Sequence, residues 1–137
     1  MALVHNIIIR GLNSIWTNAP LVCSTNPEGK TDSESTAASS LKSCPDIANL
    51  MGYAQMLLIM IHQHHHGEET VIFPLLQEKV DMGINVDQHE SFQTPMKALE
   101  QYIGDVKEGR EIYDWKTMRR VTEEFAEPLI EHLREEV

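Results

Sequence analysis

The amino-acid sequence predicts an all-α protein that folds as an antiparallel, up-down-up-down four-helix bundle. Apolar residues recur three and four positions apart in four separate stretches, which is the repeat of one helical face. No stretch alternates apolar and polar residues as a half-buried strand would. The chain of 137 residues has the size of one domain, and mostly short links join the four stretches, which favours antiparallel neighbours.

Capping residues and prolines set the expected limits of the helices. The helices are expected over residues 3–16, 47–79, 85–106 and 115–137. Asp46 and Asp114 are the expected N-caps of the second and fourth helices, because a short carboxylate can accept hydrogen bonds from the first backbone N–H groups. Pro74, Pro95 and Pro128 should each bend the helix that contains it, because a proline ring removes one backbone hydrogen bond.

Residues 24–43 separate the first two helices and are rich in serine and threonine, with hardly an apolar side chain. A segment with so little to bury should form a flexible loop. Two roles stay open for this loop, a linker that tolerates insertion and a lid over a site.

Composition and charge exclude several classes of partner. Asp plus Glu number 21 against 11 Lys plus Arg, and the formal charge of −10 disfavours nucleic acid and anionic membranes. The longest apolar run, residues 56–61, is far shorter than a bilayer span, and the first residues lack the pattern of a secretory signal. Cys23 and Cys44 form no CxxC pair and are expected as free thiols. We therefore expect a cytoplasmic protein.

Each of the four helices turns one histidine toward the core. At 100° per residue, these are His5, His89 and His132 on the first, third and fourth helices. The second helix turns His64 inward and, four residues later, Glu68. The apolar stripes that carry them are Ile8, Ile9, Leu12 and Trp16; then Leu50, Ala54, Leu57, Ile61, Val71 and Leu75; then Val86, Phe92, Met96 and Ile103; and finally Met118, Val121, Phe125 and Leu129.

The other histidines in the run at 62–66 have different expected positions. His62 and His66 fall on the opposite face of the helix and should be solvated. His65 lies on the flank, about 100° from His64, which argues against a direct line from its ring to the same metal. On the fourth helix, Glu136 follows His132 by four residues and continues the inward face.

Four inward histidines with two inward glutamates predict a metal centre. A lone histidine on an apolar face is more often a hydrogen-bonded core residue, but two buried carboxylates cost several kcal/mol each without a cation. Imidazoles bind first-row transition metals and carboxylates bridge pairs of them, which favours iron, with manganese or zinc as less favoured occupants. The Glu-x-x-His pair of ferritin-like bundles, the HExxH of zinc proteases and the GxSxG elbow are all missing from the sequence.

The segment at residues 64–74, HHHGEETVIFP, resembles the signature of the hemerythrin-like (HHE cation-binding) family. Three further motifs follow the order of that family: His5-Asn6 on the first helix, Gln88-His89 on the third, and HLREE at residues 132–136. The resemblance covers the whole chain and implies a hemerythrin-like bundle.

The resemblance implies a non-haem di-iron centre, bridged by two carboxylates and an oxo or hydroxo group, with an open position for dioxygen. By this resemblance the terminal ligands are His5, His64, His89 and His132, and the bridges are Glu68 and Glu136. This chain departs from the family at Gln93. For hemerythrins that carry oxygen reversibly, the resemblance implies a second histidine at this position, one turn after the first on the third helix.

The loss of one imidazole at Gln93 favours oxygen activation, or a labile metal, over reversible carriage of oxygen. The expected partners are then dioxygen and a small organic molecule that the protein oxidises. Two alternatives stay open. One is a protein that binds or senses oxygen, nitric oxide or iron without catalysis, and the other is a structural metal or zinc site without redox chemistry.

Overall fold

The computed structural model describes residues 2–22, 44–79 and 83–135, with the backbone alone for residues 83–88. All of its regular elements are helices, and the part of the chain it describes contains no strand. The elements are α1 (Ala2–Asn18), α3 (Pro45–Gly67), the π-helix η1 (Glu68–Ile72), α4 (Phe73–Leu76), α5 (Gly83–Lys107) and α6 (Trp115–Glu135).

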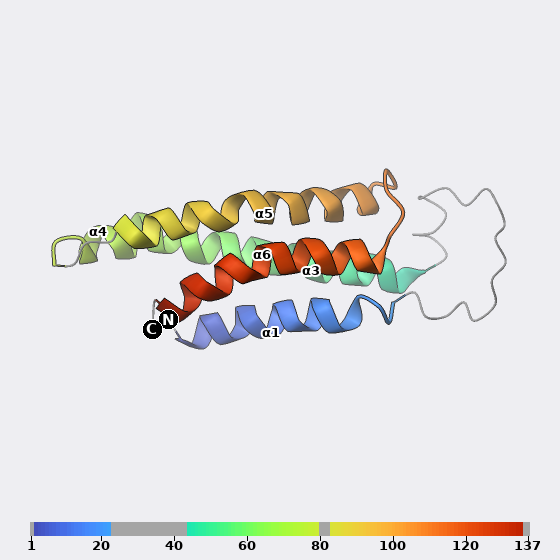
Figure 1. Ribbon diagram of the computed structural model, residues 1–137, viewed down its shortest axis with the longest axis horizontal. Coiled ribbons are helices and arrows are strands. Elements are labelled where there is room, and N and C mark those ends of the chain that lie inside the picture. The colour runs from blue at the N-terminus through green and yellow to red at the C-terminus, as the bar shows by residue number, and fades with distance from the viewer. Residues whose placement is uncertain (1, 23–43, 80–82, 136–137) are drawn as a thin grey trace.

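Helices α1, α3, α5 and α6 form the bundle, with η1 and α4 extending α3 at one end (Figure 1). Successive long helices run in opposite directions, and the ends of α1 and α6 lie side by side at the left of Figure 1. The main contacts join α1 to α3, α3 to α5, α5 to α6, and α6 back to α1. Each helix therefore packs against two neighbours around a common core, which confirms the predicted all-helical bundle.

The helix starts follow local capping chemistry. Asp114 caps α6 as expected, because its Oδ2 accepts hydrogen bonds from the backbone N–H of Thr117 at 2.8 Å and from the Thr117 hydroxyl at 2.7 Å. The expectation for α3 is wrong by two residues, since Cys44 is the N-cap and Pro45 opens the helix. Proline suits this first position, where its missing N–H would have no partner inside the helix.

The second helix changes to a π-helical turn before Pro74. In η1 the N–H of Phe73 bonds to the carbonyl of Glu68, five residues earlier. Pro74 has no N–H to offer the preceding turn. Within the π-helix, the Thr70 hydroxyl donates to the His66 carbonyl at 2.7 Å. The sequence thus locates the irregularity correctly, although helical structure ends at Leu76 rather than at residue 79.

The π-helix also explains two wrong core assignments. A π-helical turn holds more residues than an α-helical turn, so residues after Glu68 rotate less than the 100° used in the prediction. Val71 and Leu75 are consequently 55% and 67% exposed, whereas Phe73 is 5% exposed. On α1, Trp16 is also outside the core at 39% exposure, where its indole donates to Glu123 Oε1 at 2.6 Å.

The helices with internal prolines remain continuous. Helix α5 runs through Pro95, and α6 runs through Pro128. Figure 1 shows α6 bending in its C-terminal half, the half that contains Pro128. This bend agrees with the expected loss of one backbone hydrogen bond.

The apolar core fills the bundle between the cluster of histidines and the opposite end. Its fully buried members include Ile8, Met51, Leu99, Met118 and Phe125. Leu57 of α3 packs closely over Gly11 of α1, because a Cβ built at Gly11 would lie 2.6 Å from a Leu57 methyl group. The absence of a side chain at Gly11 leaves room for this contact.

The predicted loop at 24–43 lies outside the described residues, as does Cys23. A hydrogen bond connects the described residues on either side of this segment, since the Cys44 thiol donates to the Val22 carbonyl at 3.2 Å. Cys44 is a free cysteine. Among the described helices, none combines the length and the apolar character that a bilayer span requires.

Candidate metal centre

The inward histidines gather at the end of the bundle away from the link between α1 and α3. His5 lies in the first turn of α1, His89 in the second turn of α5 and His132 in the last turn of α6. His64 and His65 occupy the last turn of α3, and Glu68 opens η1 directly after it. The antiparallel order of the helices therefore brings residues from across the whole sequence to one place.

The cluster is buried. The exposed fractions are 3% for His5, 6% for His65, 2% for Glu68, 1% for His89 and 0% for His132. The side chain of His64 is 11% exposed. Burial of this many polar groups is costly unless each group has a partner, so the arrangement of their donor atoms is informative.

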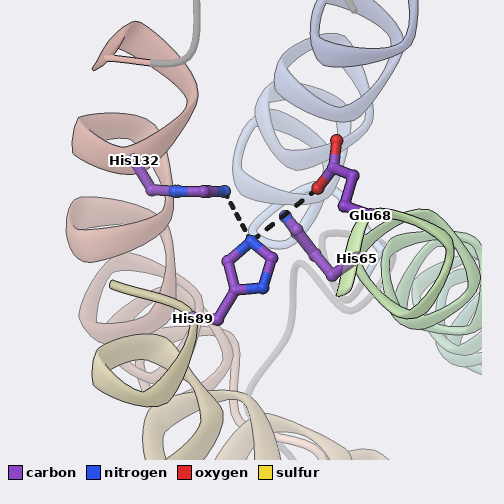
Figure 2. Close-up of side chains that lie close together, drawn as sticks. All are labelled: His65, Glu68, His89 and His132. Carbon is purple, nitrogen blue, oxygen red and sulfur yellow. Dashed lines mark hydrogen bonds and ion pairs between the residues drawn. The ribbon is translucent and has the colours of Figure 1, made fainter. Parts of the chain in front are cut away.

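The donor atoms form two groups that share one residue. In the first group, one donor atom from each of His65, Glu68, His89 and His132 lies within 4.8 Å of all the others. Figure 2 shows these four side chains converging from α3 and η1, from α5 and from α6. The second group joins His5, His64 and Glu68 at the same spacing. Two nitrogen ligands on opposite sides of one metal ion are roughly 4 Å apart. The donor atoms of each group are therefore only slightly farther apart than they would be around a bound ion.

Glu68 connects the two groups through its two carboxylate oxygens. Oε1 lies 3.1 Å from Nε2 of His64, and Oε2 lies 3.7 Å from Nε2 of His89. One oxygen therefore faces each group. A carboxylate in this position can bridge two metal ions.

His89 is held with its Nε2 unprotonated. Its Nδ1 lies 2.7 Å from Oε1 of Glu69, and because a carboxylate only accepts, Nδ1 must carry the proton and donate. The Nε2 of neutral His89 then presents a lone pair toward the cluster. His132 Nε2, 3.0 Å from it, must donate in the metal-free protein. An outer carboxylate that fixes a histidine in this way is a usual feature of metal sites.

Burial keeps the imidazoles of the cluster uncharged. It is the largest cause of a lowered pKa at all five histidines. The pKa falls to about 4 at His64, to about 3 at His132 and to about 2 at His65. At all three residues, neighbouring imidazoles also disfavour the charged form. Neutral imidazole is the form that binds a metal, so no proton needs to leave a charged ring at neutral pH.

His65 gives a direct test of whether a metal fits. Its Nε2 is fully buried and has no hydrogen-bond partner in the part of the chain that the structure describes. A buried imidazole nitrogen without a partner is costly in an apolar core, whereas it is the ordinary state of a nitrogen that binds a metal. The residues present thus fit a metal ion.

The structure brings most of the sequence-predicted residues together. His5, His64, Glu68, His89 and His132 lie in the two donor groups, and Glu136 lies outside the described residues. His62 and His66 are exposed, as expected, and His62 Nε2 lies 2.8 Å from Glu100 Oε1. Gln93 is exposed at the edge of a cavity.

The expectation that His65 lies on the flank is wrong. The prediction included Val71 and Leu75 in the apolar stripe, but Val71 lies within the π-helix and Leu75 lies after it, so both displace the centre of the stripe away from His65. The signal that would have found it is local. Ala54, Leu58, Ile61 and His65 are spaced four, three and four residues apart, which is the repeat of one helical face.

Comparison with known proteins places this geometry in a family. A curated relative, the dimeric xanthone biosynthesis cluster protein R11 of Cryptosporiopsis sp. (strain 8999), is 30% identical over the whole of this chain. The chain spans 46% of the length of that relative. No solved structure gave a significant match. The family model for the hemerythrin HHE cation binding domain matches residues 28–136, a range that holds every residue of the cluster except His5. The chain therefore belongs to the hemerythrin HHE cation-binding domain family, as its sequence motifs indicate.

Proposed function

We propose that the cluster holds two iron ions and that the protein uses them to activate dioxygen and oxidise a small organic molecule. The observation that carries this proposal is the position of Glu68, whose carboxylate belongs to both donor groups. A buried carboxylate between two sets of neutral imidazoles is suited to a pair of cations rather than to one.

The two metal positions would differ in their ligands. His65, His89 and His132 would bind the first ion, His5 and His64 the second, and Glu68 would bridge them. Glu136 is proposed as a second bridge on the ground of sequence alone. The second position would have one imidazole fewer than the first, which leaves it room for a small molecule such as dioxygen.

Iron suits this donor set, as do manganese and zinc. Imidazole and carboxylate together suit iron, manganese and zinc, while calcium and magnesium prefer oxygen ligands alone. When bound, ferrous iron supplies the electrons that dioxygen requires for reduction. For an oxidase reaction the organic molecule would give up two electrons and two protons, and dioxygen would become hydrogen peroxide.

The protein's own residues would tune this chemistry. Glu69 holds the proton of His89 on Nδ1, which keeps Nε2 available to the metal. Phe73 and Phe92 pack against the His89 ring at centroid distances of 5.2 and 5.6 Å and limit the access of water. The name of the relative refers to a biosynthesis cluster, which supports an enzymatic role over a purely structural one.

Anaerobic loading with ferrous iron, followed by exposure to air, tests the proposal. Mass spectrometry should find two irons per chain, and the visible spectrum should gain the absorption of an oxidised di-iron centre. Consumption of dioxygen should then depend on an added organic reductant. Repeated binding and release of dioxygen without any reductant would indicate a carrier or sensor instead, and a colourless protein that retains only zinc would indicate a structural site.

A further inference from the structure

A cavity of about 190 Å³ opens between α3 and α5, next to the first donor group. Its inner wall contains His65 and His89, so a molecule in the cavity would contact two of the proposed metal ligands directly. The rest of the inner wall is apolar and is formed by Phe92 and Met96, both buried. No residue of the second donor group lines this cavity.

The inner wall of the cavity suits a flat ring. The ring of Phe92 lies 4.8 Å from that of His65 and 5.6 Å from that of His89, centroid to centroid. Three rings in contact, with a thioether beside them, form a polarisable surface on which an aromatic molecule packs well. An apolar cavity of about 150 Å³ is enough to hold benzene, so this one has room for a single substituted ring.

The outer edge of the cavity carries uncommitted polar groups. Two of its side chains already have partners, since Glu69 accepts from His89 at 2.7 Å and His62 lies 2.8 Å from Glu100. Gln93 and Lys97, one turn apart on α5, have no hydrogen bond or ion pair with any described residue. The edge thus offers one free ammonium group and one free amide to a ligand.

These free groups favour an anionic ligand in spite of the acidic chain. The formal charge of −10 repels anions at a distance, but salt screens charges over about 8 Å, so the charged groups on the cavity edge decide the affinity. The Lys97 ammonium attracts a carboxylate, while the Glu69 carboxylate opposes it but is engaged with His89. Lysine is a compact donor for a carboxylate, and the amide of glutamine can add a second hydrogen bond.

We propose that this cavity binds a small monoaromatic carboxylate, with its ring on Phe92 and Met96 and its carboxylate at Lys97 and Gln93. The opposite end of the ring would then lie beside His65 and His89. This inference rests on the proposed function in one respect, which is that the bound acid would be the molecule that is oxidised. Binding itself requires no redox chemistry.

Calorimetry on the full-length, zinc-loaded protein tests binding apart from oxidation. The probes are 4-hydroxybenzoate and the neutral molecule phenol. Lys97→Gln should weaken 4-hydroxybenzoate about fivefold and leave phenol unchanged, because only the acid loses an ion pair. Lys107→Gln, with the same change of charge on the same helix outside the cavity, is the matched control and should leave both affinities unchanged.

A second variant tests the location. Gln93→Trp places a large ring at an exposed position on the cavity edge, where the fold should tolerate it, and should abolish binding of both probes. Unchanged binding in Gln93→Trp, or equal losses in the two lysine variants, would overturn the inference. So would the absence of binding at millimolar concentrations. If the acid binds to the zinc form but the iron form consumes no dioxygen with it, the cavity stands and the proposed oxidation fails.

Discussion

Glu68 and Glu69 are neighbours in the sequence with different surroundings. The side chain of Glu68 is 2% exposed and lies in both donor groups, whereas that of Glu69 is 41% exposed and reaches the cluster only through His89. Under the proposed function Glu68 bridges two ions and Glu69 orients one ligand, so removal of each charge should affect metal binding in a different way.

Replacement of each glutamate by glutamine separates these roles. Glu68→Gln should lower the affinity for both ions and uncouple their binding, because the amide is a poor bridge. Glu69→Gln should keep a stoichiometry of two and weaken binding about 10- to 100-fold, as changes in outer partners of metal ligands usually do. Titration with ferrous iron under anaerobic conditions measures both. Equal behaviour of the two variants would contradict the shared position of Glu68.

The metal content of a His65→Ala variant tests the residue that the helical arithmetic misplaced. Its Nε2 is buried without a partner, so we expect the variant to lose the ion of the first donor group and to retain about half of the bound iron. His66→Ala, one residue along and exposed, is the control and should retain both ions. Mass spectrometry of the loaded proteins gives the result, and full occupancy in His65→Ala would exclude it as a ligand.

The buried histidines should make the metal-free protein sensitive to acid. The pKa is about 4 for His64 and about 3 for His132, but near 6.5 for each in the unfolded chain. Below 6.5 the unfolded state binds protons that the folded state does not. The free energy of unfolding should therefore fall as the pH decreases from about 6.5 to about 4, by about 1.4 kcal/mol per unit for each such histidine.

Urea denaturation at a series of pH values measures this slope. His132→Gln should reduce the slope by the contribution of one proton, because its ring is buried in the folded state. A slope that is the same in both proteins would show that His132 binds a proton as readily in the folded state as in the unfolded state.

At the scale of single residues, the sequence predicted much of the site. The inward direction of His5, His89 and His132 follows from regular α-helical periodicity, and the structure buries all three. His65 was missed because the turn that follows it is not α-helical. The contact of Glu69 with His89 joins two helices, and no periodicity within one helix can predict it.

The π-helix η1 is the element that gives this site its form. It opens with Glu68 and rotates the following residues, so that Phe73 rather than Val71 packs beside His89. The sequence signals an irregularity through Pro74, but proline is compatible with a kink, a break or a wider turn. Which of these forms depends on packing between helices, so the choice lies beyond the local sequence.

Two glycines in helices test how closely the elements are packed. Gly52→Ala should stabilise the protein by about 1 kcal/mol, because alanine favours α3 and a Cβ there meets nothing within 4 Å. Gly11→Ala should lose that gain or destabilise, since its Cβ would lie 2.6 Å from Leu57 and push α1 away from α3.

The displacement in Gly11→Ala should also weaken iron binding, because α1 carries His5 while α3 carries His64. Thermal denaturation and iron titration of the two variants provide the comparison. The double variant Gly11→Ala, Leu57→Ala should recover part of the affinity if the clash is the cause. Identical stability of the two single variants would show that Leu57 or α1 accommodates the added Cβ without cost.

For the whole molecule, metal removal should lower the melting temperature. Ligands that bind only the folded state stabilise it by about 2.7 kcal/mol at a concentration 100 times the Kd, which corresponds to about 10 °C for a domain of this size. Scanning calorimetry with and without a chelator should show this shift in the natural sequence. The double variant His64→Ala, His65→Ala should show almost none, and an equal shift in both would assign the metal to another place.

The arrangement of the bundle was predictable as a whole because its four amphipathic stripes leave few alternatives. The site follows from that topology, since antiparallel order returns the first turn of α1 and the last turn of α6 to the same end. Glu136 and residues 24–43 stay as predictions, because they lie outside the described residues.

His5 and His132 stand near opposite ends of the sequence and meet on either side of Glu68. A bound metal pair would therefore act as a crosslink that closes a loop of nearly the whole chain. Such a crosslink would hold α1 against α6, so that these two helices separate late in unfolding and resist proteolysis for as long as the metal stays bound.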